Sequence, residues 1–221
     1  MKLTVQEINR KALHIVSGTL IPAGIFYLPL LPGVGRWVPA AILAVLAAGS
    51  LGLEFARLRY PAVQKYFYAF AGKALREQER ASLTGSTWIF LSAFLCAVIF
   101  LGREHIAFMA LSMFILGDAV AALVGISIGR VRIGKKSLEG SLACFFLCLV
   151  LMLLVFPHVP LLLEAWGGTM PMGIAIAAAL STTFFELFPL RLTPRIVLND
   201  NLSVPVITGI VMNLMWTAGG A

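Results

Sequence analysis

The chain has 221 residues, of which 60% are hydrophobic and 12% are charged, and its formal net charge is +7. An ordinary soluble domain carries about 25% charged residues, so this composition excludes a soluble globular protein. In a membrane protein, positive charge orients the chain and attracts anionic headgroups or phosphates, so we expect no nucleic-acid partner. The sequence predicts a single integral-membrane domain over residues 1–221.

Seven apolar stretches follow one another along the chain. A spanning helix needs roughly 20 apolar residues, and most of the stretches meet this length. The fifth is the weakest, with its clean apolar run starting only after Ser141. We therefore expect an all-α polytopic membrane bundle of about seven transmembrane helices. The predicted spans are Leu13–Leu31, Val38–Phe55, Thr84–Leu101, Ile106–Ile128, Leu138–Phe156, Met170–Phe188 and Leu202–Ala218.

The longest polar connection, Arg57–Leu83, contains one further predicted helix. Val63, Phe67, Phe70 and Ala74 recur there at helical spacing, while polar residues occupy the other faces. This pattern is typical of an amphipathic helix that lies in the membrane interface. A helix that only anchors the bundle would have the same pattern.

The basic residues fall almost entirely on one side of the predicted membrane. Of the 17 Lys and Arg residues, only Arg36 and Arg103 lie in the alternate set of connections. The positive-inside rule therefore predicts a multi-pass protein of the cell membrane with a cytosolic N-terminus and an external C-terminus. The connections that contain most of the polar residues then face the cytosol.

Asp118 lies inside the fourth predicted span, about 15 Å of helix from its cytosolic end. A carboxylate at that depth costs at least ~2.5 kcal/mol, so it should face a cavity, a metal ion or a partner. The alternative is a buried Asp that pairs with a neighbouring helix. Gly117, Ala121 and Gly125 form a stripe of small residues beside it, which suits close approach of a ligand or, more often, of another helix.

The connection Gly129–Gly140 is short, glycine-rich and basic, as a phosphate-binding loop would be. It nearly matches a Walker A pattern, but Lys136 follows Lys135 where Ser or Thr is needed and no strand precedes it. We therefore reject a P-loop fold. A basic loop that serves only to orient the protein is the alternative, although it would not require Glu139 beside two lysines.

Carboxylates next to a cationic loop suggest a nucleoside triphosphate bound with Mg²⁺, because Mg²⁺ takes one or two carboxylates plus phosphate oxygens. Arg10, Lys11 and His14 add donors at the first cytosolic boundary. Asn199 and Asp200 are equally explained as the cap of the last helix. Glu54 and Arg57, three residues apart, are equally explained as a local ion pair.

These residues together resemble the polyprenol kinase family, which includes dolichol kinase, phytol kinase and the CTP-dependent diacylglycerol kinase. That family is distantly similar to phosphatidate cytidylyltransferase. The likeness runs in order over nearly the whole chain. Its motifs here are Arg10-Lys11…His14, Glu54, Arg76-x-x-Glu79…Thr84-Gly85, Gly117-Asp118-x-x-Ala121…Gly125, Lys135-Lys136-Ser137-x-Glu139-Gly140-Ser141, Glu186 and Asn199-Asp200-Asn201.

The resemblance implies transfer of the γ-phosphate, usually of CTP and with Mg²⁺, to the hydroxyl of a membrane-embedded lipid alcohol such as a polyprenol, a phytol-like alcohol or diacylglycerol. It implies catalytic roles for Asp118, Lys135 and Lys136. The metal ligands it implies are Asp118, Glu139, Glu186 and Asp200. The nucleotide-binding residues are Arg10, Lys11, His14, Arg76, Glu79, Gly125, Ser137, Glu139, Ser141, Asn199 and Asn201.

Two other functions stay open. A cytidylyltransferase would form a CDP-lipid and release pyrophosphate. A small-solute transporter would need polar groups along its whole path, but the outer halves of the spans have almost no ionisable residue. The Gly- and Ala-rich helix faces also permit a homodimer.

Overall fold

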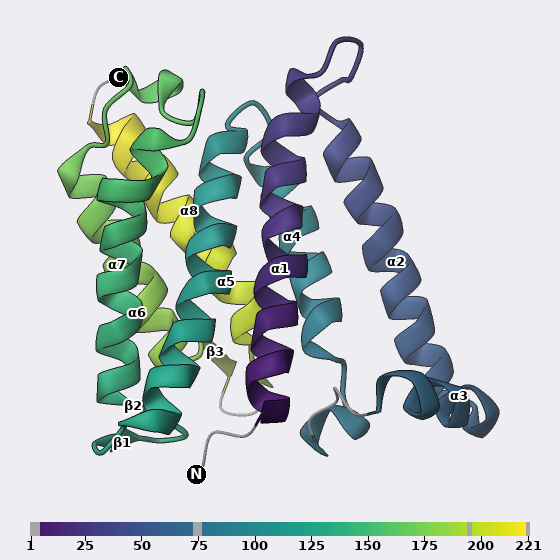
Figure 1. Cartoon of the computed structure of the whole chain (residues 1–221). Helices are drawn as coiled ribbons and strands as arrows, with labels where there is room; N and C mark the ends of the chain where they lie inside the picture. The colour runs from purple at the N-terminus through teal and green to yellow at the C-terminus, as the bar shows by residue number, and fades with distance from the viewer. Residues whose placement is uncertain (1–4, 73–76, 194–195, 220–221) are drawn as a thin grey trace.

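The computed structural model describes residues 5–72, 77–193 and 196–219, and of the N-terminal segment up to His14 it describes no side chain. The described chain is a bundle of long helices (Figure 1). The α-helices are α1 Val5–Tyr27, α2 Val38–Arg59, α3 Pro61–Ala71, α4 Gly85–Ile99, α5 Glu104–Ser127, α6 Leu138–Val150, α7 Met172–Leu187 and α8 Asp200–Ala218. Short 3-10 or π segments are η1 Leu28–Leu30, η2 Glu77–Arg80, η3 Leu151–Val155, η4 Phe156–His158 and η5 Glu164–Trp166.

Among the described residues, four helical segments are long and apolar enough to cross a membrane: Val38–Arg59, Glu104–Ser127, Leu138–His158 and Asp200–Ala218. Three shorter apolar helices accompany them, at Gly18–Leu30, Gly85–Ile99 and Met172–Leu187. These seven segments coincide with the seven predicted spans. The prediction of an all-α membrane bundle is confirmed.

The weak fifth span is completed by an irregular helical extension. α6 ends at Val150, and the π segment η3 and then the 3-10 turn η4 continue it to His158 without a break. Pro157 interrupts the α-helical hydrogen bonding near the end of this stretch, because it has no N–H to donate. The whole stretch reaches 21 residues, which is enough to span the membrane.

Helix α5 forms the centre of the bundle. It packs against α1 on one side and α6 and α8 on others, and α7 packs against both α6 and α8 (Figure 1). Met109, Met113 and Phe114 of α5 are almost completely buried. α2 lies at the edge, where its main neighbours are α4 and α3. Its Val45 is 72% exposed and its Phe55 68%, as expected for side chains that meet lipid.

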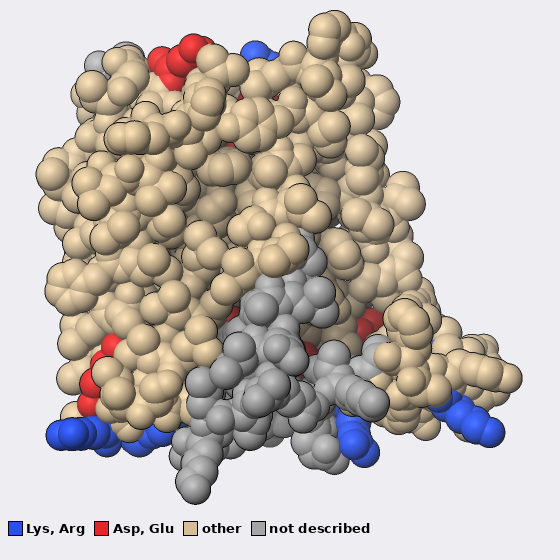
Figure 2. Space-filling model, viewed as in Figure 1, with Lys and Arg blue, Asp and Glu red and all other residues tan. Residues whose placement is uncertain are grey.

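One end of the bundle bears most of the described basic residues, and we call it the basic end. α1 begins there, α2 ends there, and α3, η2 and the loop after α5 lie there (Figure 1). The Lys and Arg side chains line this edge in the space-filling view, whereas the sides are almost wholly uncharged (Figure 2). The predicted segregation of charge is therefore present in the described residues.

The interfacial helix is shorter than the sequence predicts. α3 covers only Pro61–Ala71 of the predicted region, and η2 follows after the undescribed residues 73–76, among which Ala74 falls. Val63 and Phe67 are half-buried, but Phe70 is 96% exposed and so does not share their packing.

Two connections at the basic end form small antiparallel hairpins, and the first is the predicted phosphate-binding loop. β1 Arg132–Ile133 pairs with β2 Lys136–Ser137, and β3 Arg191–Thr193 pairs with β4 Ile196–Val197. The first hairpin turns through Gly134 and Lys135. Gly134 has φ +61°, which a two-residue hairpin turn requires and glycine adopts without strain.

Candidate functional site

Lys136, Glu186 and Asp200 meet at the basic end. β2 contributes the lysine, the last turn of α7 the glutamate and the first residue of α8 the aspartate. Lys136 Nζ lies 2.6 Å from Glu186 Oε1 and 3.1 Å from Asp200 Oδ2, and it also donates to the main-chain oxygen of Glu186. Three residues that the sequence placed in separate motifs therefore form one cluster, which we call the lysine–acid cluster.

The environment of the lysine favours its charged form. Burial by itself lowers the pKa of Lys136, but Glu186 and Asp200 oppose this effect by attraction and hydrogen bonding, and the pKa is raised above its ordinary value. Lys136 therefore stays protonated throughout the physiological range.

Asp118 adds a third carboxylate near this cluster. It lies on α5, half-buried, close enough to Glu186 for the two carboxylates to interact electrostatically. The face of α5 that bears Gly117 packs closely against α6 and α7. A Cβ at Gly117 would lie 2.8 Å from Cys144 Sγ on α6 and 3.9 Å from Thr182 Cγ2 on α7. Asp118 therefore interacts electrostatically with the same glutamate that Lys136 contacts.

The remaining part of the hairpin is held by Glu139. Its Oε1 accepts hydrogen bonds from the backbone N–H groups of Arg130 at 2.9 Å and Val131 at 3.1 Å. This contact closes the loop onto the first turn of α6. Glu139 therefore lies on the loop side, and its Oε2 is buried without a hydrogen-bond partner among the described residues. Its place in the predicted metal set stays a prediction. Lys135, at the turn, is exposed.

Three predicted nucleotide-binding residues lie in internal contacts between α5 and α6. Ser137 caps α6 by accepting from Gly140 N at 3.1 Å, and Ser141 Oγ donates to Ser137 O at 3.1 Å. A Cβ at Gly125 would lie 2.8 Å from Ser137 Oγ. Of the two explanations for the small-residue stripe, helix packing accounts for Gly117 and Gly125. A binding role for these residues stays a prediction.

Asn199 and Asn201 connect α8 to the region before α4. Asn199 Oδ1 accepts from Asn201 N at 3.0 Å and so caps α8, which is one of the two explanations the sequence left open. Asn201 Nδ2 donates to Gly85 O at 3.0 Å, and Gly85 N donates to Glu79 Oε1 at 2.8 Å. Gly85 therefore links Glu79 to Asn201, the residue that follows Asp200.

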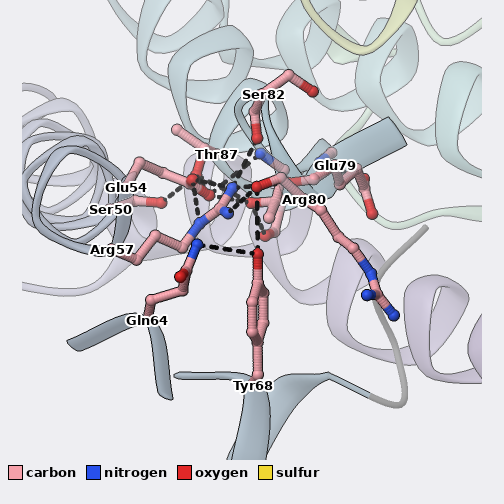
Figure 3. A network of polar contacts seen from close by, with 12 residues as sticks. Ser50, Glu54, Arg57, Gln64, Tyr68, Glu79, Arg80, Ser82 and Thr87 are labelled. Atoms are coloured by element: carbon pink, nitrogen blue, oxygen red, sulfur yellow. Dashed lines mark hydrogen bonds and ion pairs between the residues drawn. The ribbon is translucent and has the colours of Figure 1, made fainter. Parts of the chain in front are cut away.

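A buried ion pair holds the segment that contains Glu79 (Figure 3). Arg57 donates to Glu54 Oε2 at 2.6 Å, and both side chains are almost fully buried at the end of α2. Arg57 also donates to the backbone oxygens of Glu79 at 3.0 Å, Ser82 at 2.6 Å and Arg80 at 3.4 Å. The local pair that the sequence suggested therefore also binds a segment 22–25 residues away.

Glu54 has a second function in the same network. Its Oε1 accepts from Thr84 Oγ1 at 2.6 Å, Thr84 N at 3.1 Å and Thr87 Oγ1 at 3.2 Å, which fixes the start of α4 (Figure 3). The sequence analysis missed these hydrogen bonds, because no local pattern reveals partners 30–33 residues away. The available signal was a charged pair at the end of an apolar span, where an uncompensated charge would be costly.

Several predicted residues cannot be placed. The side chains of Arg10, Lys11, His14 and Arg76 lie outside the described residues. Within the part of the chain that the structure describes, no group of three or more His, Cys, Asp or Glu side chains is arranged to hold a metal ion. Glu186 nevertheless has a buried oxygen, Oε2, for which the described residues supply no hydrogen-bond partner.

The chain is similar to curated proteins over nearly its whole length. The chain is 28% identical to a probable chloroplastic phytol kinase of Triticum aestivum, over 97% of this chain and 69% of that protein. It is 25% identical to probable phytol kinase 2 of Glycine max, over 98% of this chain and 68% of that one. The chain is related to the polyprenol and phytol kinases.

A relative of similar size is an uncharacterized protein of Rickettsia prowazekii, 27% identical over 90% of both chains. No family model matches the chain, and no solved structure matches it. The relation to the phytol kinases thus comes from sequence similarity that spans nearly all of this chain and about two thirds of theirs.

Proposed function

We propose that the chain is a membrane phosphotransferase that moves the γ-phosphate of a nucleoside triphosphate to the hydroxyl of a membrane lipid alcohol. The observation on which this depends is the meeting of Lys136, Glu186 and Asp200, with Asp118 beside them, at the basic end of an apolar bundle. The probable phytol kinases among its relatives favour a phytol-like alcohol as acceptor, and CTP is the donor that the family resemblance favours.

The charges at this end suit an anionic donor. Lys135 is exposed at the hairpin turn and Lys136 lies behind it. Helices α4, α6 and α8 all begin at the basic end, so the positive ends of their dipoles add to the attraction for phosphates (Figure 1). These features would hold the phosphates of the nucleotide close to the membrane surface.

The residues also fit a magnesium ion. Mg²⁺ is held by one or two carboxylates and completes its shell with phosphate oxygens, so a group of three protein ligands is not required. Glu186 and Asp200 would hold it, and the unpaired Oε2 of Glu186 supplies a suitable oxygen. When bound, the ion would neutralise charge on the transferring phosphate.

Asp118 is then assigned to the acceptor. In the transfer, the alcohol oxygen bonds to the γ-phosphorus, the bond between that phosphorus and the β-phosphate oxygen breaks, and the hydroxyl proton leaves. A carboxylate deep in the bundle, surrounded by apolar helix surfaces, can orient the hydroxyl and accept its proton. The products are a lipid phosphate and a nucleoside diphosphate.

The test uses the purified protein in liposomes with γ-labelled CTP or ATP and phytol, a polyprenol or diacylglycerol. We expect the label to appear in lipid phosphate and unlabelled CDP or ADP to be released. Label that leaves only as pyrophosphate would establish a cytidylyltransferase instead. Flux of a polar solute that is lost in Asp118→Ala, without lipid labelling, would favour a transporter.

The proposed cytosolic orientation has a test of its own. Arg132 and Arg36 are exposed and lie on opposite predicted sides of the membrane. The three native cysteines are buried, so a thiol reagent should leave these cysteines unlabelled. In intact cells a membrane-impermeant thiol reagent should label Arg36→Cys and spare Arg132→Cys. The reverse pattern would place the lysine–acid cluster outside the cell.

A further inference from the structure

Lys136 lies where a metal ion would have to bind. Its ammonium contacts Glu186 Oε1 at 2.6 Å and Asp200 Oδ2 at 3.1 Å, and these are the two carboxylates proposed as ligands. The Glu186 side chain is 4% exposed, whereas those of Lys136 and Asp200 are 26% and 29% exposed. The glutamate is therefore fixed in the bundle, while the lysine can swing outward on its flexible stem.

The lysine satisfies this site incompletely. Glu186 Oε2 is buried without a hydrogen-bond partner among the described residues, although burial of an unpaired carboxylate oxygen is unfavourable. Asp118 and Asp200 both act on Glu186 electrostatically. One ammonium therefore faces two carboxylates, and a divalent cation with oxygen ligands would balance their charge better.

The ammonium and a metal ion would repel each other at these two carboxylates. Mg²⁺ lies about 2.0–2.1 Å from its ligands, so an ion bound to Glu186 Oε2 and Asp200 would lie only a few ångströms from an ammonium that kept its contact with Oε1 of the same glutamate. We propose that Lys136 and a divalent cation compete for Glu186 and Asp200. The identity of the cation rests on the proposed function. The displaced ammonium then turns to a phosphate of the nucleotide.

This exchange makes cation and nucleotide binding cooperative. The cation alone must break the contacts of Lys136 with Glu186 and Asp200. A nucleotide offers the released ammonium a new anionic partner, so each ligand strengthens the binding of the other. Lys136 thus delays metal binding until the donor is present.

The first experiment measures Mn²⁺ binding to the full-length protein in detergent micelles without nucleotide, from the electron paramagnetic resonance signal of free Mn²⁺. We expect Lys136→Met to bind Mn²⁺ at least tenfold more tightly than the natural chain. Lys65→Met, which removes an exposed lysine of α3, should match the natural chain. Equal or weaker binding by Lys136→Met would overturn the proposal.

A double variant tests whether the tighter Mn²⁺ binding of Lys136→Met occurs at Glu186. Adding Glu186→Gln to Lys136→Met should abolish the gain in Mn²⁺ affinity, since a fixed ligand is lost. A gain that persists in the double variant would place the cation elsewhere and overturn the assignment.

A measurement on the natural chain removes any dependence on the folding of variants. Lysine acetylation by a small acylating reagent, read by peptide mass spectrometry, reports how accessible each amine is. Mn²⁺ should raise acetylation of Lys136 several-fold relative to Lys135, its internal standard. An unchanged ratio would contradict the exchange. None of these readouts uses phosphate transfer, so failure of the kinase assay and failure of the exchange are separate results.

Discussion

Arg57, on the last turn of α2, donates to the backbone oxygen of Glu79 at 3.0 Å and so ties a spanning helix to the segment that precedes α4. Its charge is neutralised within α2 by Glu54, whose carboxylate is also bound by Thr84. Asn201 joins the same region through Gly85. The polar contacts at the basic end therefore form one connected framework that reaches the first turn of α8.

We expect Arg57→Ala to be strongly destabilising. It leaves the Glu54 carboxylate buried without its ion pair, a change that costs about 3–5 kcal/mol. Thermal unfolding in micelles should show a large drop in midpoint. Arg59→Ala, which removes an exposed arginine two residues away, is the control and should change stability little. Similar midpoints for the two variants would mean that the pair is dispensable.

Gly117→Ala should weaken the contact between α5 and α6. The added methyl group would lie 2.8 Å from Cys144 Sγ, and overpacking of this kind costs about 1–3 kcal/mol. Gly49→Ala on α2 is the matched control, because no atom lies within 4 Å of its Cβ position and alanine favours a helix by up to about 1 kcal/mol. The thermal midpoint should fall in the first variant and hold or rise in the second.

Asp118→Asn keeps the size of the side chain and removes its charge. If Asp118 accepts the proton of the lipid hydroxyl, turnover in the lipid-labelling assay should fall by about 10²–10⁴-fold with the fold intact. Glu164→Gln, in an exposed position after α6, should retain full turnover. Undiminished turnover of Asp118→Asn would reduce the aspartate to a packing residue.

From pH 7 upward, the contribution of the lysine–acid cluster to stability should depend on pH only in alkaline solution. The pKa of Lys136 is raised in the folded chain, so its pairing is fully present below the ordinary lysine value of 10.5 and is lost as pH rises through the higher folded value. The difference in thermal midpoint between the natural chain and Lys136→Met should stay constant from pH 7 to about 10 and shrink above that. A difference that disappears below pH 9 would contradict the assignment.

The sequence by itself determined the membrane architecture. Seven apolar stretches and their one-sided basic residues are local properties, set by the thickness of the bilayer and the cost of moving charge across it, so no knowledge of packing is needed to find them. The same local rules identified Asp118 as unusual and Lys135–Lys136 as a basic turn. Asn199 was recognisable as a possible cap of the last helix for the same reason.

Only the tertiary structure decided how the acids are divided. Lys136 pairs with carboxylates 50 and 64 residues away, whereas Glu139, only three residues on, turns to the backbone of its own loop. Composition could not separate these cases, because Glu139, Glu186 and Asp200 all lie on the predicted cytosolic side. Their partners depend on which faces α5, α6, α7 and α8 turn toward one another, and close packing of small residues such as Gly117 sets those faces.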